Sequence, residues 1–179
     1  KPSTAVVIGG GFIGVEIAEN LIHKGIKTSI IEASDQVLAP LDPEMATLVS
    51  KEMTLQGVEL DLSDGVSTID VETVTLASGV VLPAALVILA IGVRPDTALA
   101  KAAELNIGER GGIEVDEFNR TSDHDIYAVG DAAQKNDALD GTATLVPLAN
   151  LANRHGRVVA DHIAGLITRP VKTIGTAIV

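Results

Sequence analysis

Residues 4–14 read TAVVIGGGFIG, a short apolar run that leads directly into three glycines. A continuous apolar run bounded by glycine is typical of a buried strand, so we expect one from Thr4 to Gly9. Phe12 to Lys24 is predicted to be a helix, because its apolar residues recur four apart and Gly25 is placed to end it. A strand, a glycine turn and a helix in this order indicate an α/β fold.

Alternating strands and helices continue beyond this opening. We expect strands over 27–32 and 58–62, a helix from Asp42 to Gln56, a β-meander over 65–82, and a strand over 86–91 that Gly92 ends. Parallel strands joined by helices require right-handed crossovers. The predicted fold class is therefore α/β, a Rossmann-like doubly wound parallel sheet with an antiparallel β-meander.

The pattern changes past about Gly108. Brief strands are predicted at Ile113–Val115 and Ile126–Val129, on either side of a polar turn, and Pro147 is predicted to open a long helix to about Ala164. Residues 173–179 are expected to begin another strand. We interpret this half as part of a second α/β domain, with the boundary at the pair Gly111-Gly112.

The 179-residue chain carries a net charge of −11, with 2% aromatic residues and no cysteine. An acidic chain with few aromatics argues against nucleic acid as a partner, and the missing cysteine excludes disulfides and thiolate zinc sites formed by this sequence alone. The longest apolar run, Val80 to Val93, contains Pro83 and is too short to cross a membrane. The composition is compatible with a cytoplasmic location. Because the chain begins at Lys1 without Met, we expect it to be a piece of a longer protein.

The turn at residues 9–14 fits the dinucleotide-binding fingerprint through Gly9, Gly11 and Gly14. In that pattern the first glycine permits a tight turn, the second admits a pyrophosphate to the backbone, and the third lets helix and strand pack closely. Phe12 and Ile13 then open the helix, whose free N–H groups favour phosphates. A turn that serves packing alone is the alternative, and FAD uses the same fingerprint for its ADP half.

Glu32 ends the next predicted strand, 23 residues after Gly9. A carboxylate there can accept both adenosine ribose hydroxyls and repels a 2′-phosphate. Since no Lys or Arg occurs between Thr28 and Lys51, the sequence favours NAD(H) over NADP(H). An ordinary exposed acid at a strand end is the alternative.

A second candidate site lies at Gly130-Asp131, after the predicted strand Ile126–Val129. Gly130 would let a ligand approach the backbone, and Asp131 at the carboxyl end of a strand could accept a hydrogen bond from a sugar-alcohol hydroxyl. An Asp in a turn that begins a helix is an equal alternative. The four histidines are predicted to be structural, and no metal site is expected.

The segments GGGFIGVEIAENL, AIGVRPDT, TSDHDIYAVGDAA and VPLANLANRHGRVVADHIAG occur in this order and span nearly the whole chain. Together they resemble the FAD-dependent pyridine nucleotide-disulfide oxidoreductases, most closely the NADH oxidase, NADH peroxidase and coenzyme A-disulfide or persulfide reductase branch. The resemblance implies an NAD(H)-binding domain over 1–110, the C-terminal half of a FAD domain over 111–167, and the start of a C-terminal interface domain over 168–179. It also implies that the redox cysteine lies outside this chain. On this interpretation the chain supplies no catalytic residue and is inactive by itself.

Further site residues are carried over by position in the motifs. Glu16, predicted in the first helical turn, resembles the family glutamate near the nicotinamide, and a surface acid that complements the helix dipole is the alternative. Gly92 would pass close to NAD, unless it only turns the strand end. The resemblance implies that Asp131 binds the FAD ribityl and pyrophosphate region. The remaining residues of this kind form the predicted helix start facing the flavin: Pro147, Leu148 and Ala149.

The resemblance implies hydride transfer from NADH to FAD and then electron transfer to a disulfide, persulfide, peroxide or oxygen. The expected cofactors are FAD and NAD(H), the expected partners are a small-molecule or thiol/disulfide substrate, and the full-length protein is expected to be a homodimer. Two alternatives stay open: a ferredoxin or rubredoxin reductase-like flavoprotein, and a non-catalytic nucleotide-binding redox module.

Overall fold

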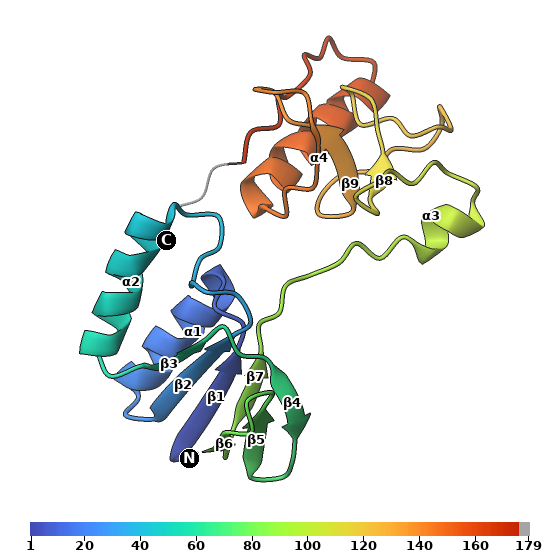
Figure 1. Ribbon diagram of the computed structural model, residues 1–179. Helices are drawn as coiled ribbons and strands as arrows, with labels where there is room; N and C mark the ends of the chain where they lie inside the picture. The colour runs from blue at the N-terminus through green and yellow to red at the C-terminus, as the bar shows by residue number, and fades with distance from the viewer. Residues whose placement is uncertain (176–179) are drawn as a thin grey trace. The chain divides into compact units, whose positions relative to one another are not determined.

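The computed structural model describes residues 1–175 and divides the chain into two compact units, residues 1–92 and 93–179 (Figure 1). The first unit holds a parallel sheet with the strand order β3-β2-β1-β7. Its strands are β1 (Thr4–Ile8), β2 (Lys27–Glu32), β3 (Glu59–Leu62) and β7 (Val87–Leu89). The strands expected over 27–32 and 58–62 are confirmed, as is the one that begins at Thr4.

Two helices cover one face of this sheet. α1 (Phe12–His23) connects β1 to β2, and α2 (Pro43–Leu55) connects β2 to β3. Alternate strand residues point to opposite faces, and Ala5, Val7 and Ile30 face the buried helix residues Ala18, Leu21 and Met53. Both helices were expected, although Asp42 makes no side-chain capping bond within the described residues.

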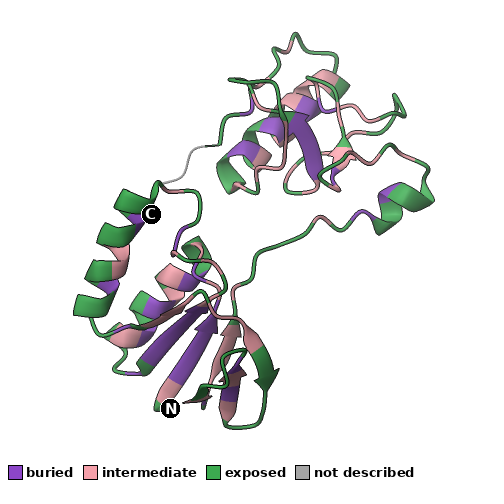
Figure 2. Cartoon of the chain, viewed as in Figure 1, coloured by how far each residue is buried: buried purple, intermediate pink, exposed green. Residues whose placement is uncertain are grey.

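An antiparallel meander covers the opposite face. It consists of β4 (Val66–Ile69), β5 (Thr73–Leu76) and β6 (Val81–Pro83), in the order β4-β5-β6. Val6, Ile8 and Ile31 form a second core with Val74 and Leu76 of β5. The α/β fold with a parallel sheet and an antiparallel meander is confirmed, and the meander takes the face that a second layer of helices covers in a doubly wound sheet. Figure 2 shows β1 and β2 buried between the two layers.

The strand expected over 86–91 is shorter and less buried than its sequence indicates. Among the described residues β7 pairs only with β1, and it ends at Leu89, so it is an edge strand of this sheet. Leu89 is 61% and Ile91 73% exposed. The expected bounds of 86–91 are wrong, because an apolar run does not show where pairing with the neighbouring strand ends.

The second unit contains a small sheet in the order β10-β9-β8 and two helices. Its elements are α3 (Ala98–Ala102), β8 (Ile113–Glu114), β9 (Ala133–Asn136), β10 (Ala143–Thr144) and α4 (Ala149–Ile163). β9 is central, parallel to β8 and antiparallel to β10. α4 buries Leu151, His155 and Val159 along one face. The described residues contain no helix that is long and apolar enough to cross a membrane.

Several expectations for this unit need correction. The strand expected at Ile126–Val129 is wrong, because only Tyr127 forms an isolated bridge, to Arg120. The strand lies after Gly130-Asp131 instead, at Ala133–Asn136. The helix begins at Ala149 rather than Pro147.

The ends of the predicted domains differ in part from the observed division. The division of the chain falls between Gly92 and Val93, whereas Gly111 and Gly112 lie inside the second unit, where Gly112 packs on Gln134 of β9. At the C-terminus Thr173 forms a bridge with Asp137, and residues 174 and 175 are not in a strand. Residues 176–179 of the predicted strand lie outside the described residues. The cofactor-domain limits at 110 and 167 stay predictions.

Candidate functional site

The glycine turn between β1 and α1 is held by contacts that admit no side chain. Gly9 has φ +109°, and a Cβ there would collide with the carbonyl group of Ala90. A Cβ on Gly14 would collide with the carbonyl oxygen of Gly9. The first and third glycines of the fingerprint therefore serve the tight turn and the close helix–strand packing predicted for them.

Gly11 differs, because packing does not require it to be a glycine. It is the N-cap of α1 with an extended backbone, and a Cβ there would meet no described atom within 4 Å. Its position leaves open space at the positive end of a helix, where backbone N–H groups can donate to an anion. These features fit a pyrophosphate against the backbone of Gly11.

Glu32, the last residue of β2, points its carboxylate at this turn. Its Oε2 accepts the Gly10 N–H at 2.7 Å, and its Oε1 accepts the Ser34 N–H and the Ser34 hydroxyl, each at 2.8 Å. Partial burial raises the pKa of Glu32, but the hydrogen bonds from Ser34 and Gly10 outweigh burial and leave that pKa below its ordinary value. The carboxylate is therefore ionised at neutral pH and oriented beside the turn.

Other acidic groups follow along the neighbouring strand. Asp61 on β3 pairs in register with Ile31, and Glu59 and Asp64 lie close to it. Burial, followed by the charges of Glu59 and Asp64, raises the pKa of Asp61. Glu59 begins β3 and pairs with Lys27. The negative charge beside Glu32 at the carboxyl ends of β2 and β3 therefore comes from Asp61 and Asp64, and it disfavours an additional phosphate there.

The remaining predicted residues of the first unit lie around the turn. Phe12 and Ile13 are exposed at the start of α1, and Gly92, with φ +88°, lies two residues after Ala90, which contacts Gly9. Glu16 is exposed but lies in the second turn of α1, so its predicted first-turn position is wrong. Since α1 begins at Phe12, the alternative of a dipole-complementing acid loses its basis.

The second unit has a cavity of about 140 Å³ beside the other predicted site. Asp131 and Pro147 line it, together with residues that the sequence analysis did not assign to a site: Val93, Arg94, Pro95, Asp96, Ala132 and Leu145. Residues 93–96 belong to the AIGVRPDT segment, from which only Gly92 was singled out. The structure thus brings Asp131 to Pro147 and adds one basic and one acidic side chain.

The start of α4 closely follows Pro147, which lines this cavity. Leu148 is its N-cap with an extended backbone, and Ala149 is its first helical residue. Gly130 has φ +80°, and a Cβ there would lie 3.8 Å from the Cβ of Ala152 on α4. Gly130-Asp131 precedes a strand instead of following one, so the predicted strand-end position of Asp131 is wrong.

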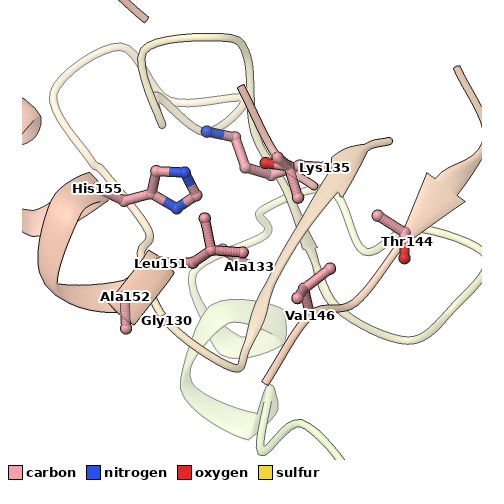
Figure 3. A pocket seen from close by; sticks show the side chains of 9 residues that line it. Gly130, Ala133, Lys135, Thr144, Val146, Leu151, Ala152 and His155 are labelled. Carbon is pink, nitrogen blue, oxygen red and sulfur yellow. The ribbon is translucent and has the colours of Figure 1, made fainter. Parts of the chain in front are cut away.

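A smaller cavity, of about 10 Å³, lies under α4 (Figure 3). Lys135 of β9, His155 of α4 and Thr173 line it, and all three are buried. Lys135 donates to Asn119 at 2.9 Å, whereas His155 Nε2 has no partner among the described residues. Burial, and then the Lys135 charge, lowers the pKa of His155. The volume suits one water molecule and excludes a cofactor.

One cluster could hold a cation by its ligand types alone. The side chains of Asp123, His124 and Asp125 gather within 4.8 Å, and all three residues are exposed. Adjacent exposed residues in a turn do not by themselves form a metal site. The predictions of no metal site and structural histidines stay open, and His155 does lie in the core of its unit.

Comparison with known proteins identifies the family. The family model "Pyridine nucleotide-disulphide oxidoreductase" matches residues 1–156. This chain belongs to that family. An NADH oxidase from Methanocaldococcus jannaschii is 37% identical over 96% of the chain and 39% of its own length. An NAD(P)H coenzyme A polysulfide/persulfide reductase from Pyrococcus horikoshii is 35% identical over 99% of the chain and 41% of its own length.

Solved structures of the family agree with the fold. The crystal structure of reduced Bacillus anthracis CoADR-RHD matches with a TM-score of 0.92 and 47% identity, over 96% of this chain and 31% of that one. The chain therefore spans about two fifths of the length of the curated relatives it matches.

Proposed function

We propose that this chain binds NAD(H) at the glycine turn and part of FAD at residues 130–131 and 147–149, within a larger flavoprotein NADH oxidoreductase. The glycine turn carries the proposal, because it combines an open backbone at Gly11 with an ionised Glu32 aimed at the same turn. When bound, NADH supplies a hydride and FAD accepts it.

In the first unit each proposed nucleotide-binding residue has a defined role. Gly11, Phe12 and Ile13 supply backbone at the positive end of α1 for the pyrophosphate, while Gly9 and Gly14 allow the turn to close. Glu32 accepts hydrogen bonds from the adenosine ribose. Its charge, with the acidic groups on β3, disfavours a 2′-phosphate and so selects NADH over NADPH. Glu16 and Gly92 lie on the nicotinamide side of the same site.

In the second unit the cavity at Asp131 supports the FAD assignment. Asp131 lies at the ribityl and pyrophosphate region and accepts a hydrogen bond from a ribityl hydroxyl, and Gly130 leaves room for the ligand. The N-terminus of α4, at Pro147, Leu148 and Ala149, stabilises negative charge on the flavin ring through the helix dipole. We assign residues 1–110 to the NAD(H) part, 111–167 to the FAD part and 168–179 to an interface domain.

For the whole protein we propose that electrons leave FAD for a disulfide, persulfide, peroxide or oxygen. Relatives named as an NADH oxidase and a coenzyme A polysulfide/persulfide reductase support this range. The redox cysteine would lie outside these 179 residues, which contain none. A cytoplasmic homodimer is the proposed form of the whole protein.

The test is rapid mixing of the full-length protein with NADH or NADPH without oxygen, followed by the loss of oxidised-flavin absorbance. We expect NADH to reduce the flavin faster than NADPH, and Glu32→Ala to remove that preference while Glu19→Ala keeps it. Equal rates for the two nucleotides in the parent would contradict the assignment of Glu32.

A further inference from the structure

The carboxylate of Glu32 is nearly saturated with hydrogen bonds before any nucleotide arrives. Oε1 accepts two bonds, from the N–H and the hydroxyl of Ser34, and Oε2 accepts one from the Gly10 N–H. A carboxylate offers about four lone-pair sites in total. Counting the three hydrogen bonds from Gly10 and Ser34, one site remains, on Oε2, and the Ala33 N–H also interacts with the carboxylate. Two ribose hydroxyls need two.

Only one of the three donors can leave without moving the backbone. The backbone of Gly10 is also held at the following peptide, where the Gly10 carbonyl accepts the Leu38 N–H at 2.8 Å. The backbone of Ser34 is held in the same way, because the Ser34 carbonyl accepts the Ser63 N–H at 2.8 Å. The Ser34 hydroxyl, in contrast, turns about a single bond.

That hydroxyl has a second acceptor within reach. Its Oγ lies 2.8 Å from Glu32 Oε1 and 3.0 Å from the carbonyl oxygen of Gln36. A serine hydroxyl carries one proton, so it donates to one of these oxygens at a time. The bond to the carboxylate is the stronger of the two, because its acceptor is charged.

We propose that the Ser34 hydroxyl is a two-position switch, donating to Glu32 in the free protein and to Gln36 when Glu32 accepts both ribose hydroxyls of NAD(H). This inference rests on the proposed NAD(H) binding at the glycine turn. Ser34 acts through Glu32 and is a positioning residue. The hydrogen bond from the Ser34 hydroxyl to Glu32 competes with the ribose hydroxyls, so it lowers the affinity for NAD(H). In the absence of nucleotide, the same bond keeps the Glu32 carboxylate oriented.

Removing the Ser34 hydroxyl changes NAD⁺ affinity in opposite directions, depending on whether that hydroxyl supports Glu32 or competes with ribose. If Ser34 only held the carboxylate in place, its removal would weaken nucleotide binding. If the hydroxyl competes with ribose, Ser34→Ala tightens NAD⁺ binding, by about threefold, the difference between a charged and a neutral acceptor. The gain depends on both ribose hydroxyls, because a single hydroxyl fits the site already free on Oε2.

The experiment is calorimetric titration of the intact protein with NAD⁺, which leaves the flavin oxidised, and with NAD⁺ lacking the adenosine 2′-hydroxyl. Ser34→Ala is compared with Ser34→Thr, which keeps the hydroxyl, and melting curves confirm that each variant is folded. We expect Ser34→Ala to bind NAD⁺ about threefold more tightly and the deoxy analogue as the parent does. Ser34→Thr should match the parent with both ligands.

Three results would overturn the switch alone: weaker NAD⁺ binding by Ser34→Ala, an equal gain for both ligands, or Ser34→Thr behaving as Ser34→Ala. No binding of NAD⁺ by the folded parent would overturn the proposed function, and the switch with it. The two failures are therefore distinguishable by the parent titration.

Discussion

Glu32 Oε2 accepts a hydrogen bond from the Gly10 N–H at 2.7 Å, which ties the end of β2 to the glycine turn that follows β1. The residue proposed to select the ribose therefore also holds the backbone proposed to bind the pyrophosphate. Changes at either end of the nucleotide site are coupled through this bond.

Replacing Glu32 by Ala should lower NADH affinity by at least about tenfold, since hydrogen bonds to a charged group contribute roughly 1.5–3 kcal/mol. Titration calorimetry with NAD⁺, which leaves the flavin oxidised, measures the corresponding loss for the nucleotide. Glu59→Ala is the matched control, because Glu59 lies on the adjacent strand and pairs with Lys27 at 2.9 Å on the exposed surface. A comparable loss in both variants would show a general effect of charge.

The pKa of Glu32 is lowered in the folded protein, from a model-peptide value of 4.5. A carboxyl group of this kind stabilises the fold above its unfolded pKa, and the contribution is lost as pH falls through the lower, folded pKa. Chemical unfolding between pH 6 and pH 3 should therefore show a declining free energy of unfolding, with a shallower decline in Glu32→Gln. Identical slopes for parent and variant would contradict the linkage.

Gly14→Ala and Gly11→Ala should separate packing from binding. A Cβ on Gly14 collides with the Gly9 carbonyl, so we expect a loss of about 1–3 kcal/mol of stability or more. A Cβ on Gly11 meets no described atom, so Gly11→Ala should lose less than about 1 kcal/mol of stability. The same substitution should weaken nucleotide binding. Thermal melting and NAD⁺ titration give the two readouts. A strongly destabilised Gly11→Ala would remove the case for open space there.

His155 should make the second unit sensitive to acid. Burial and Lys135 lower its pKa, so the unfolded chain takes up a proton near the ordinary value of 6.5 while the folded protein does not. Stability should fall as pH drops below that value, and His155→Leu should flatten the dependence. An unchanged pH dependence in His155→Leu would contradict this assignment.

The first unit was predictable because its signals are local. The bounds of β2 and the starts of β1 and α1 follow from apolar runs and from glycine at the turns. The positions of Gly9 and Gly14 follow from the fingerprint, whereas the partners of Glu32 do not. Ser34 donates two hydrogen bonds to Glu32, and the loop geometry that allows them is not encoded in any sequence pattern.

The second unit was less predictable, because residues distant in sequence supply the hydrogen-bond partners of the polar side chains on β9. β9 contains Gln134 and Lys135, which look exposed in sequence but are buried. Gln134 accepts the Arg110 N–H at 2.8 Å, and Lys135 donates to Asn119. The apolar segment at Ile126–Val129 attracted the strand prediction instead, although only Tyr127 pairs there.

The most direct test of the account uses titration calorimetry of Glu32→Ala and Asp131→Ala, with NAD⁺ added to the oxidised protein and FAD added to the flavin-free protein. We predict that Glu32→Ala weakens NAD⁺ binding and leaves FAD binding unchanged, and that Asp131→Ala weakens FAD binding and leaves NAD⁺ binding unchanged. Loss of FAD binding in Glu32→Ala, with NAD⁺ binding intact, would assign the glycine turn to FAD and contradict the account.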